Sequence, residues 1–184
     1  MEHVAWARDL AEALLAETLP RRWAHSQGVG RKAESIAHLL GDNAESVTCA
    51  AWLHDVGYAP SLVRSGSHAL DGARYLRDVA NADDIICRLV AHHSYAIVEA
   101  GRRGLAAELE AEFPPVGGLP DHAMVYCDMT TSPDGETVDV EKRLQEIASR
   151  YEPGSIVADT IAEVSPRIVD SVRMITGMPG FRAG

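Results

Sequence analysis

Residues 49–58 read CAAWLHDVGY, so that five apolar residues are followed directly by a histidine and an aspartate. The apolar run from Cys49 to Leu53 is typical of a helix that is buried in a core. Gly57 and Pro60 are expected to end this helix, with His54 and Asp55 closing it. Taken alone, His54 is compatible with a hydrogen-bonded core residue, and Asp55 with a helix end or a salt bridge.

Outward from this stretch, apolar residues recur at intervals of three and four positions, which is the period of an α-helix. Alternating runs rich in Val, Ile and Tyr, which are typical of strands, are absent from the sequence. The pattern predicts an all-α bundle of short helices in a single domain over residues 1–184, with a core of about residues 20–130 and C-terminal helices at about 138–176. Helices are expected over residues 4–19, 22–40, 44–56, 68–79, 83–95, 98–112, 121–130, 140–151 and 155–176, with Pro166 kinking or dividing the last one.

The composition is that of a globular protein, with 46% apolar and 24% charged residues in a chain of 184. Its net charge of −10 argues against non-specific binding of DNA, RNA or an anionic membrane, because such binding needs a positive surface. Nucleic acid is therefore not the expected partner, although a local site can still hold it as a substrate. No apolar stretch approaches the length of a membrane helix, about 18–20 residues.

The chain is expected to be cytoplasmic. Its N-terminus carries Glu2, Arg8, Asp9 and Glu12, which a signal peptide would not. The three cysteines are odd in number and have no CxxC spacing, which favours buried free thiols in a reducing compartment. They are Cys49, Cys87 and Cys127.

Histidines and aspartates stand at the ends or on the apolar faces of several predicted helices. Asp128 follows an apolar helical run, and a carboxylate in such a place needs a cation or several donors. One or two divalent cations would satisfy all of these groups at once, whereas separate burial needs a separate solution for each. The candidate ligands are His25, His54, Asp55, His68, His92, His93 and Asp128.

The ligand types indicate which metals to expect. Imidazole together with carboxylate suits Fe, Mn, Zn, Co or Ni, and the sequence does not distinguish among them. An oxygen-rich site without histidine would instead indicate Mg or Ca. The two oxygens of Asp55 can bridge two metal ions about 3.5–4 Å apart, the spacing of known two-metal sites.

The order H…HD…H…HH…D, with these residues, resembles the HD superfamily of metal-dependent phosphohydrolases. The sequences around these residues resemble those of the superfamily as well: WAHSQGV at the first histidine, AAWLHDVGY at the His-Asp pair, SHALDGARYL at the third histidine and RLVAHHS at the double histidine. The resemblance implies a helical core in which one metal is held by His25, His54, Asp55 and Asp128. It implies that a second metal, bridged by Asp55, is held by His68, His92 and His93.

The function expected from this resemblance is hydrolysis of a phosphomonoester or phosphodiester on a small, nucleotide-like substrate. A metal-bridging hydroxide would attack the phosphorus, so that His54 and Asp55 carry the catalysis through the metals they hold. Arg22 lies one helical turn before His25 and is a candidate to bind the phosphate, with a solvated helix-start charge as the alternative.

Two other functions remain open at the level of the sequence. A mixed-valent di-iron oxygenase resembling myo-inositol oxygenase shares the ligand set, and His93-Ser94 fits its pattern. A non-catalytic regulatory module of the same fold is the third hypothesis, although non-catalytic members of the superfamily usually lack one or more of these ligands.

Overall fold

The structure is a computed structural model, and it describes residues 2–182. Within that range the chain forms ten α-helices and no strand, apart from an isolated antiparallel bridge between Thr131 and Thr137. The all-α fold class is therefore confirmed. The helices are α1 (Glu2–Leu15), α2 (Pro20–Ile36), α3 (Ala44–Leu53), α4 (His68–Asp78), α5 (Asp84–His92), α6 (Ala96–Arg102), α7 (Ala106–Glu112), α8 (Leu119–Met129), α9 (Val140–Arg150) and α10 (Ile156–Thr176).

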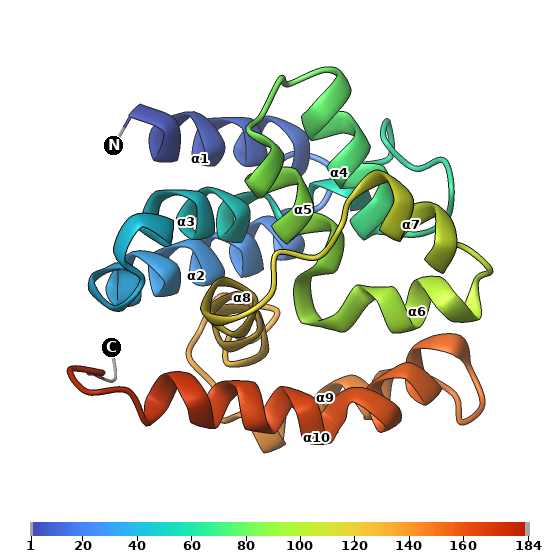
Figure 1. Ribbon diagram of the computed structural model, residues 1–184. Coiled ribbons are helices and arrows are strands. Elements are labelled where there is room, and N and C mark those ends of the chain that lie inside the picture. Colours follow the sequence, from blue (N-terminus) through green and yellow to red (C-terminus); the bar gives the residue numbers. More distant parts are fainter. Residues whose placement is uncertain (1, 183–184) are drawn as a thin grey trace.

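Helix α8 lies at the centre of the bundle (Figure 1). It packs against α2, α3 and α5 on one side and against α10 and α9 on the other. Helices α1 to α3 form one part of the molecule and α4 to α7 another, while α9 and α10 run along the side that faces away from α1. A central helix must be apolar on all faces, and every residue from 123 to 129 is buried. Asp128 is thus a carboxylate on the most deeply buried helix.

The core is formed by apolar side chains from nearly all of the helices. Leu15, Ile36, Leu53, Phe113 and Ile175 are among its most completely buried members. The three cysteines are free and buried, as the sequence predicts. None of the helices within residues 2–182 combines the length and apolar character that a membrane-spanning helix needs.

Several helix boundaries differ from the sequence expectation, and two of the differences shape the site. Helix α3 ends at Leu53, so His54 and Asp55 lie on the turn that follows rather than closing the helix. Helix α5 likewise ends at His92, and His93 begins a separate turn. In both places the chain leaves the helix at the polar residues, which lets their side chains turn away from the helical spiral.

The remaining differences lie on the outside of the bundle. The helix expected over residues 98–112 is two helices, separated at Gly104, whose φ of +76° cannot continue a right-handed helix. Pro166 does not divide the last helix, since α10 runs from Ile156 to Thr176 with the proline inside it.

Candidate metal centre

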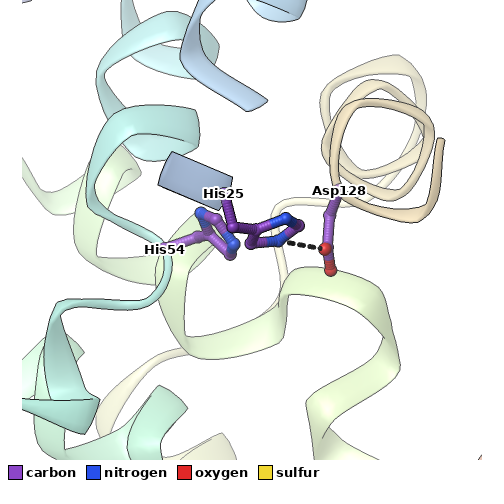
Figure 2. Close-up of side chains that lie close together, drawn as sticks. All are labelled: His25, His54 and Asp128. Carbon is purple, nitrogen blue, oxygen red and sulfur yellow. Dashed lines mark hydrogen bonds and ion pairs between the residues drawn. The ribbon is translucent and has the colours of Figure 1, made fainter. Parts of the chain in front are cut away.

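Six of the seven predicted ligands lie in two adjacent groups among the described residues. The first group is His25, His54 and Asp128, and the second is Asp55, His68 and His93. In each group, one ligand atom of every residue lies within 4.8 Å of those of the other two. Figure 2 shows the first group, in which the two imidazoles lie beside the carboxylate that α8 provides. The structure therefore brings together segments that span about one hundred residues of sequence, from His25 to Asp128.

The turn after α3 is held close to the start of α4 by a glycine. A Cβ atom added at Gly57 would lie 1.9 Å from the carbonyl oxygen of His68 and 2.7 Å from the backbone nitrogen of Gly72. Only glycine allows this approach, which brings the first residue of α4 next to Asp55. As a result, Nε2 of His68 lies 3.7 Å from Oδ1 of Asp55.

Three of the clustered histidines use the same ring atom to contact the backbone. In each case Nδ1 donates to a carbonyl oxygen: from His25 to Ser132 at 2.9 Å, from His54 to Ala51 at 2.8 Å and from His93 to Val90 at 2.7 Å. A carbonyl oxygen can only accept, so Nδ1 carries the proton and Nε2 is the atom left to bind a proton or a cation. Metal-binding histidines are oriented by this kind of outer hydrogen bond.

The carboxylate of Asp55 joins the two groups. Its Oδ2 lies 3.4 Å from Nε2 of His54 in the first group, while its Oδ1 faces His68 in the second. Oδ2 also accepts a hydrogen bond of 2.6 Å from Nη1 of Arg22. A carboxylate whose two oxygens face different ligand groups is suited to bridge two metal ions.

Two observations indicate that a cation fits among these atoms. Nε2 of His54 is buried and has no hydrogen-bond partner in the part of the chain that the structure describes. Nε2 of His68 lies 3.2 Å from Nε2 of His93. Since Nδ1 of His93 already carries a proton, a neutral His93 presents a lone pair to His68. Buried polar atoms normally have partners, and a divalent ion would supply one for Nε2 of His54. Nε2 of His68 and Nε2 of His93 are partners of each other, and a cation can replace the proton between them.

Without an ion, the charges of the cluster shift its titrations strongly. Burial lowers the pKa of His54, but the carboxylates of Asp55 and Asp128 outweigh burial and raise it to about 9. Burial, together with the nearby His93, lowers the pKa of His68 to about 3. Burial raises the pKa of Asp55, yet the Arg22 guanidinium and the His54 ring hold it well below its usual range. Such opposed shifts within one cluster are typical of functional sites.

Ser94 is a site residue whose role the sequence did not predict. Its Oγ donates to Oδ2 of Asp128, while Oδ1 of Asp128 lies 3.0 Å from Nε2 of His25. Ser94 and Tyr95 both have positive φ, 47° and 63°, which is uncommon for residues other than glycine. This strained turn carries Ser94 toward Asp128, and strain of this kind clusters at functional sites. The only sign of this turn in the sequence is the His92-His93-Ser94 motif itself.

Tyr58 is a second such residue. Its ring stacks on the His68 imidazole, with ring centroids 4.0 Å apart and planes 17° from parallel. The guanidinium of Arg22 lies 3.7 Å from the centroid of the same ring. Tyr58 therefore fixes the orientation of a candidate ligand and of a candidate phosphate-binding residue at once.

His92 is the predicted ligand that the structure places outside both groups. Its Nε2 lies 2.6 Å from the carbonyl oxygen of Phe113, and it lines a second cavity instead of the one that holds the two groups. The reason is the end of α5: the backbone of His93 is extended, with φ −52° and ψ 143°. The two adjacent histidines therefore point in different directions, and His93 is the one that reaches the cluster.

A cavity of about 510 Å³ opens onto the cluster. His25, Asp55, His68, His93 and Asp128 line one wall. Arg22 lines the same cavity. The cavity is also lined by residues from α9, α10 and the loop between them, among them Arg143, Ile147, Arg150, Tyr151, Val157, Thr160 and Ile161. The cavity is large enough for a small organic substrate.

Comparison of the sequence with known proteins identifies the family. Residues 22–154 match the HD domain family. The chain is 32% identical over 139 residues to Ribonuclease Y of Acidothermus cellulolyticus, a match that covers 71% of this chain and 26% of that protein. It is 39% identical over 70 residues to Ribonuclease Y of Rubrobacter xylanophilus, covering 38% of this chain and 14% of that protein.

The chain thus spans about a quarter or less of the length of these relatives. No solved structure matches it significantly. HD domains bind divalent metals and are typically metal-dependent hydrolases, and this chain carries histidine and aspartate groups that could hold such ions. The family match covers most of the chain, and the chain belongs to the HD domain family.

Proposed function

We propose that this protein is a metal-dependent phosphohydrolase that cleaves a phosphate ester of a small, nucleotide-like molecule. The observation that carries the proposal is the convergence of two ligand groups on the two oxygens of one carboxylate, Asp55, at the floor of a cavity. A site with shared ligands and an open side suits binding of a substrate between metal ions and solvent.

The residues present fit two transition-metal ions. His25, His54, Asp55 and Asp128 would hold one ion, and Asp55, His68 and His93 the other. Such ions, chosen from Fe, Mn, Zn, Co or Ni, supply a Lewis acid that acidifies water and neutralises phosphoryl oxygens. The chain's own part is to hold the ligands in place, through the backbone contacts of three Nδ1 atoms and the Ser94 contact to Asp128.

Arg22 is the residue we assign to the substrate phosphate on this side of the cavity. Its guanidinium reaches Asp55 and lies over Tyr58, and about one third of its side chain is exposed. A planar guanidinium can donate two parallel hydrogen bonds to phosphate, so Arg22 has donors to spare beyond the one that Asp55 accepts.

The similarity to Ribonuclease Y favours a second candidate, hydrolysis of an RNA phosphodiester. RNA would have to enter a local site, since the chain as a whole carries a net charge of −10. A small phosphate ester needs no such extended positive surface, and for that reason it is our first proposal.

The test begins with metal-free protein loaded separately with Fe, Mn, Zn, Co or Ni. Turnover is then measured on p-nitrophenyl phosphate, bis-p-nitrophenyl phosphate, a panel of nucleotides and a short RNA. We expect metal-dependent release of phosphate or nitrophenol, together with a rise in melting temperature on loading, because an ion that binds the native state stabilises it. Hydrolysis of the RNA alone would favour the second candidate.

Protein that binds metal but hydrolyses none of these substrates would contradict the proposal. Oxygen consumption by the iron-loaded protein, measured in parallel with the same substrates, would then support the di-iron oxygenase hypothesis. Undiminished stability of the metal-free protein, with no response to any ion, would favour a non-catalytic module.

A further inference from the structure

Arg143 is a buried arginine that lines the same cavity as the ligand cluster. It lies on α9, near the start of that helix, and is 7% exposed. It lines the same cavity as His25, Asp55 and Asp128, but no hydrogen bond, ion pair or ring contact joins it to any of the clustered residues among residues 2–182. It is therefore separate from Arg22, which contacts Asp55 directly.

Most of the hydrogen-bonding capacity of Arg143 is unused. A guanidinium has five N–H donors, and in the described chain a single partner, Glu146, accepts from Nη1 of Arg143. Its Nε is buried and has no partner there. Burying a charged group with unpaired donors is costly, so such a residue is normally bonded on several sides. Because Arg143 lines the cavity, an anion there can accept from those Nη donors of Arg143 that Glu146 leaves free.

The charged side chains that line the cavity also favour an anionic ligand. Besides Arg143, three more arginines line it: Arg21, Arg22 and Arg150. Apart from Asp55 and Asp128, Glu99 is the one acidic side chain among its described lining residues. Each of these arginines has a carboxylate partner, namely Asp134 for Arg21, Asp55 for Arg22 and Glu146 for both Arg143 and Arg150. The lining itself still holds four arginines against three acidic side chains, in a chain whose net charge is −10. This arrangement favours a ligand that is negatively charged beyond the phosphate at the metals.

We propose that Arg143, which lines the cavity without contacting the clustered ligands, binds a second anionic group of the substrate. This inference rests on the proposed phosphohydrolase function and narrows its substrate class to phosphate esters that carry a further phosphate or a carboxylate. Arg143 is then a specificity-determining residue, and α9 and α10, which also line the cavity, set which esters are accepted.

The competing explanation is that Arg143 serves only to pair with Glu146 and so to stabilise α9. Glu146 is about one third exposed and is shared with Arg150, so the pair is accessible to solvent on one side. A structural pair would make Arg143→Gln and Glu146→Gln equivalent in their effects. A substrate contact would make them differ, because only Arg143→Gln removes donors from the cavity.

The experiment compares two matched pairs of substrates on metal-loaded protein. AMP and adenosine bisphosphate, which carries a second phosphate on its ribose, test for a phosphate. Phosphoethanolamine and phosphoserine, which differ by one carboxylate, test for a carboxylate. Each is measured with wild-type protein, Arg143→Gln, Arg143→Lys, Glu146→Gln and, as a control, Arg173→Gln, an exposed arginine on α10.

We expect wild-type protein to prefer the more charged member of one pair. Arg143→Gln should lower kcat/KM for that member about 10- to 100-fold, through KM, with little change for its partner; this is the affinity equivalent of a charge-assisted hydrogen bond. Arg143→Lys should restore part of the preference, and Glu146→Gln and Arg173→Gln should keep it. The pair in which the preference appears identifies the group as phosphate or carboxylate.

Equal loss on both members of each pair, or equal effects of Arg143→Gln and Glu146→Gln, would overturn the inference. So would a wild-type protein with no preference in either pair. If no substrate is hydrolysed, the proposed function fails, and calorimetric binding of the same four compounds decides the inference on its own. Tighter binding of a doubly charged compound that is lost in Arg143→Gln would support it, and its absence would overturn it.

Discussion

Nε2 of His68 and Nε2 of His93 lie 3.2 Å apart, although the two residues belong to different helical segments. His93 commits its other ring nitrogen to the carbonyl of Val90. Two imidazole nitrogens at this distance share either one proton or one cation. Oδ1 of Asp55 lies 3.7 Å from Nε2 of His68, so a carboxylate oxygen lies beside the two imidazole nitrogens. Two imidazoles and one carboxylate are a set of metal ligands, which favours a shared cation over a shared proton.

The two adjacent histidines at the end of α5 should therefore behave differently. His93→Gln should lower the number of bound metal ions and abolish most turnover, because it removes a ligand atom. His92→Gln should keep both ions and lose about 1 kcal/mol of stability, the worth of one hydrogen bond to the Phe113 carbonyl. Elemental analysis and thermal unfolding check this. Loss of metal from the His92 variant alone would show that the assignment is reversed.

Asp55 can be compared with another buried aspartate. Asp71 is 4% exposed and accepts hydrogen bonds from the backbone N–H groups of Arg64 and Ser65. Asp55→Asn should reduce turnover by about 100-fold or more and weaken metal binding, since it removes the bridging charge. Asp71→Asn should instead cost about 1–3 kcal/mol of stability and leave the metal content unchanged.

Circular dichroism, elemental analysis and turnover of both aspartate variants separate the two roles. An Asp55→Asn protein that keeps its metal and its activity would remove the central element of the proposed site.

Gly57 should tolerate no side chain. Gly57→Ala would place a Cβ 1.9 Å from the backbone oxygen of His68, so the turn and α4 must move apart. We expect the free energy of unfolding to fall by at least about 1–3 kcal/mol, the usual cost of extra atoms in a packed region, or the protein not to fold at all. Gly101→Ala is the matched control: its Cβ would meet the nearest side chain at 3.9 Å, and alanine in a helix gains up to about 1 kcal/mol over glycine.

Thermal unfolding of both glycine variants is the measurement. A Gly57→Ala protein as stable as its parent would mean that α4 does not pack on the turn at this distance.

The raised pKa of His54 predicts how pH and metal binding are coupled. In metal-free protein the pKa of His54 is raised from 6.5 to about 9, so this ring is protonated at neutral pH. A raised histidine pKa stabilises the folded state below the unfolded value, and that contribution is lost as the pH rises from 6.5 through 9. His68, with a pKa of about 3, is neutral throughout this window.

Metal-free protein should therefore lose stability between pH 6.5 and 9, by about 1.4 kcal/mol per pH unit at most for one proton. The stabilisation by metal should grow over the same range, because the ion displaces the proton from Nε2 of His54. Calorimetry at neutral pH in buffers of different ionisation enthalpy should detect the released proton. Metal binding without proton release would contradict the assignment of His54 as a ligand.

The sequence by itself determined the fold class and most of the cluster. The helical period and the absence of alternating strands predicted an all-α fold. The resemblance of the HD pair, its flanking histidines and Asp128 to the HD superfamily implied seven ligands, and six of them lie in the two groups. Such predictions succeed because amphipathic period and motif order are local properties of the chain. The choice between His92 and His93 was not available in this way, since it depends on the residue at which α5 ends.

Only the tertiary structure decided the features that arise from distant contacts. The positive φ values occur at Ser94 and Tyr95, in a turn that packs on α8. The stacking of Tyr58 on His68 depends on how α4 packs on the turn after α3, and the presence of Arg143 in the same cavity as Asp55 depends on how α9 packs. No local pattern encodes which residues face each other across a cavity, because that is fixed by the packing of whole helices against one central helix.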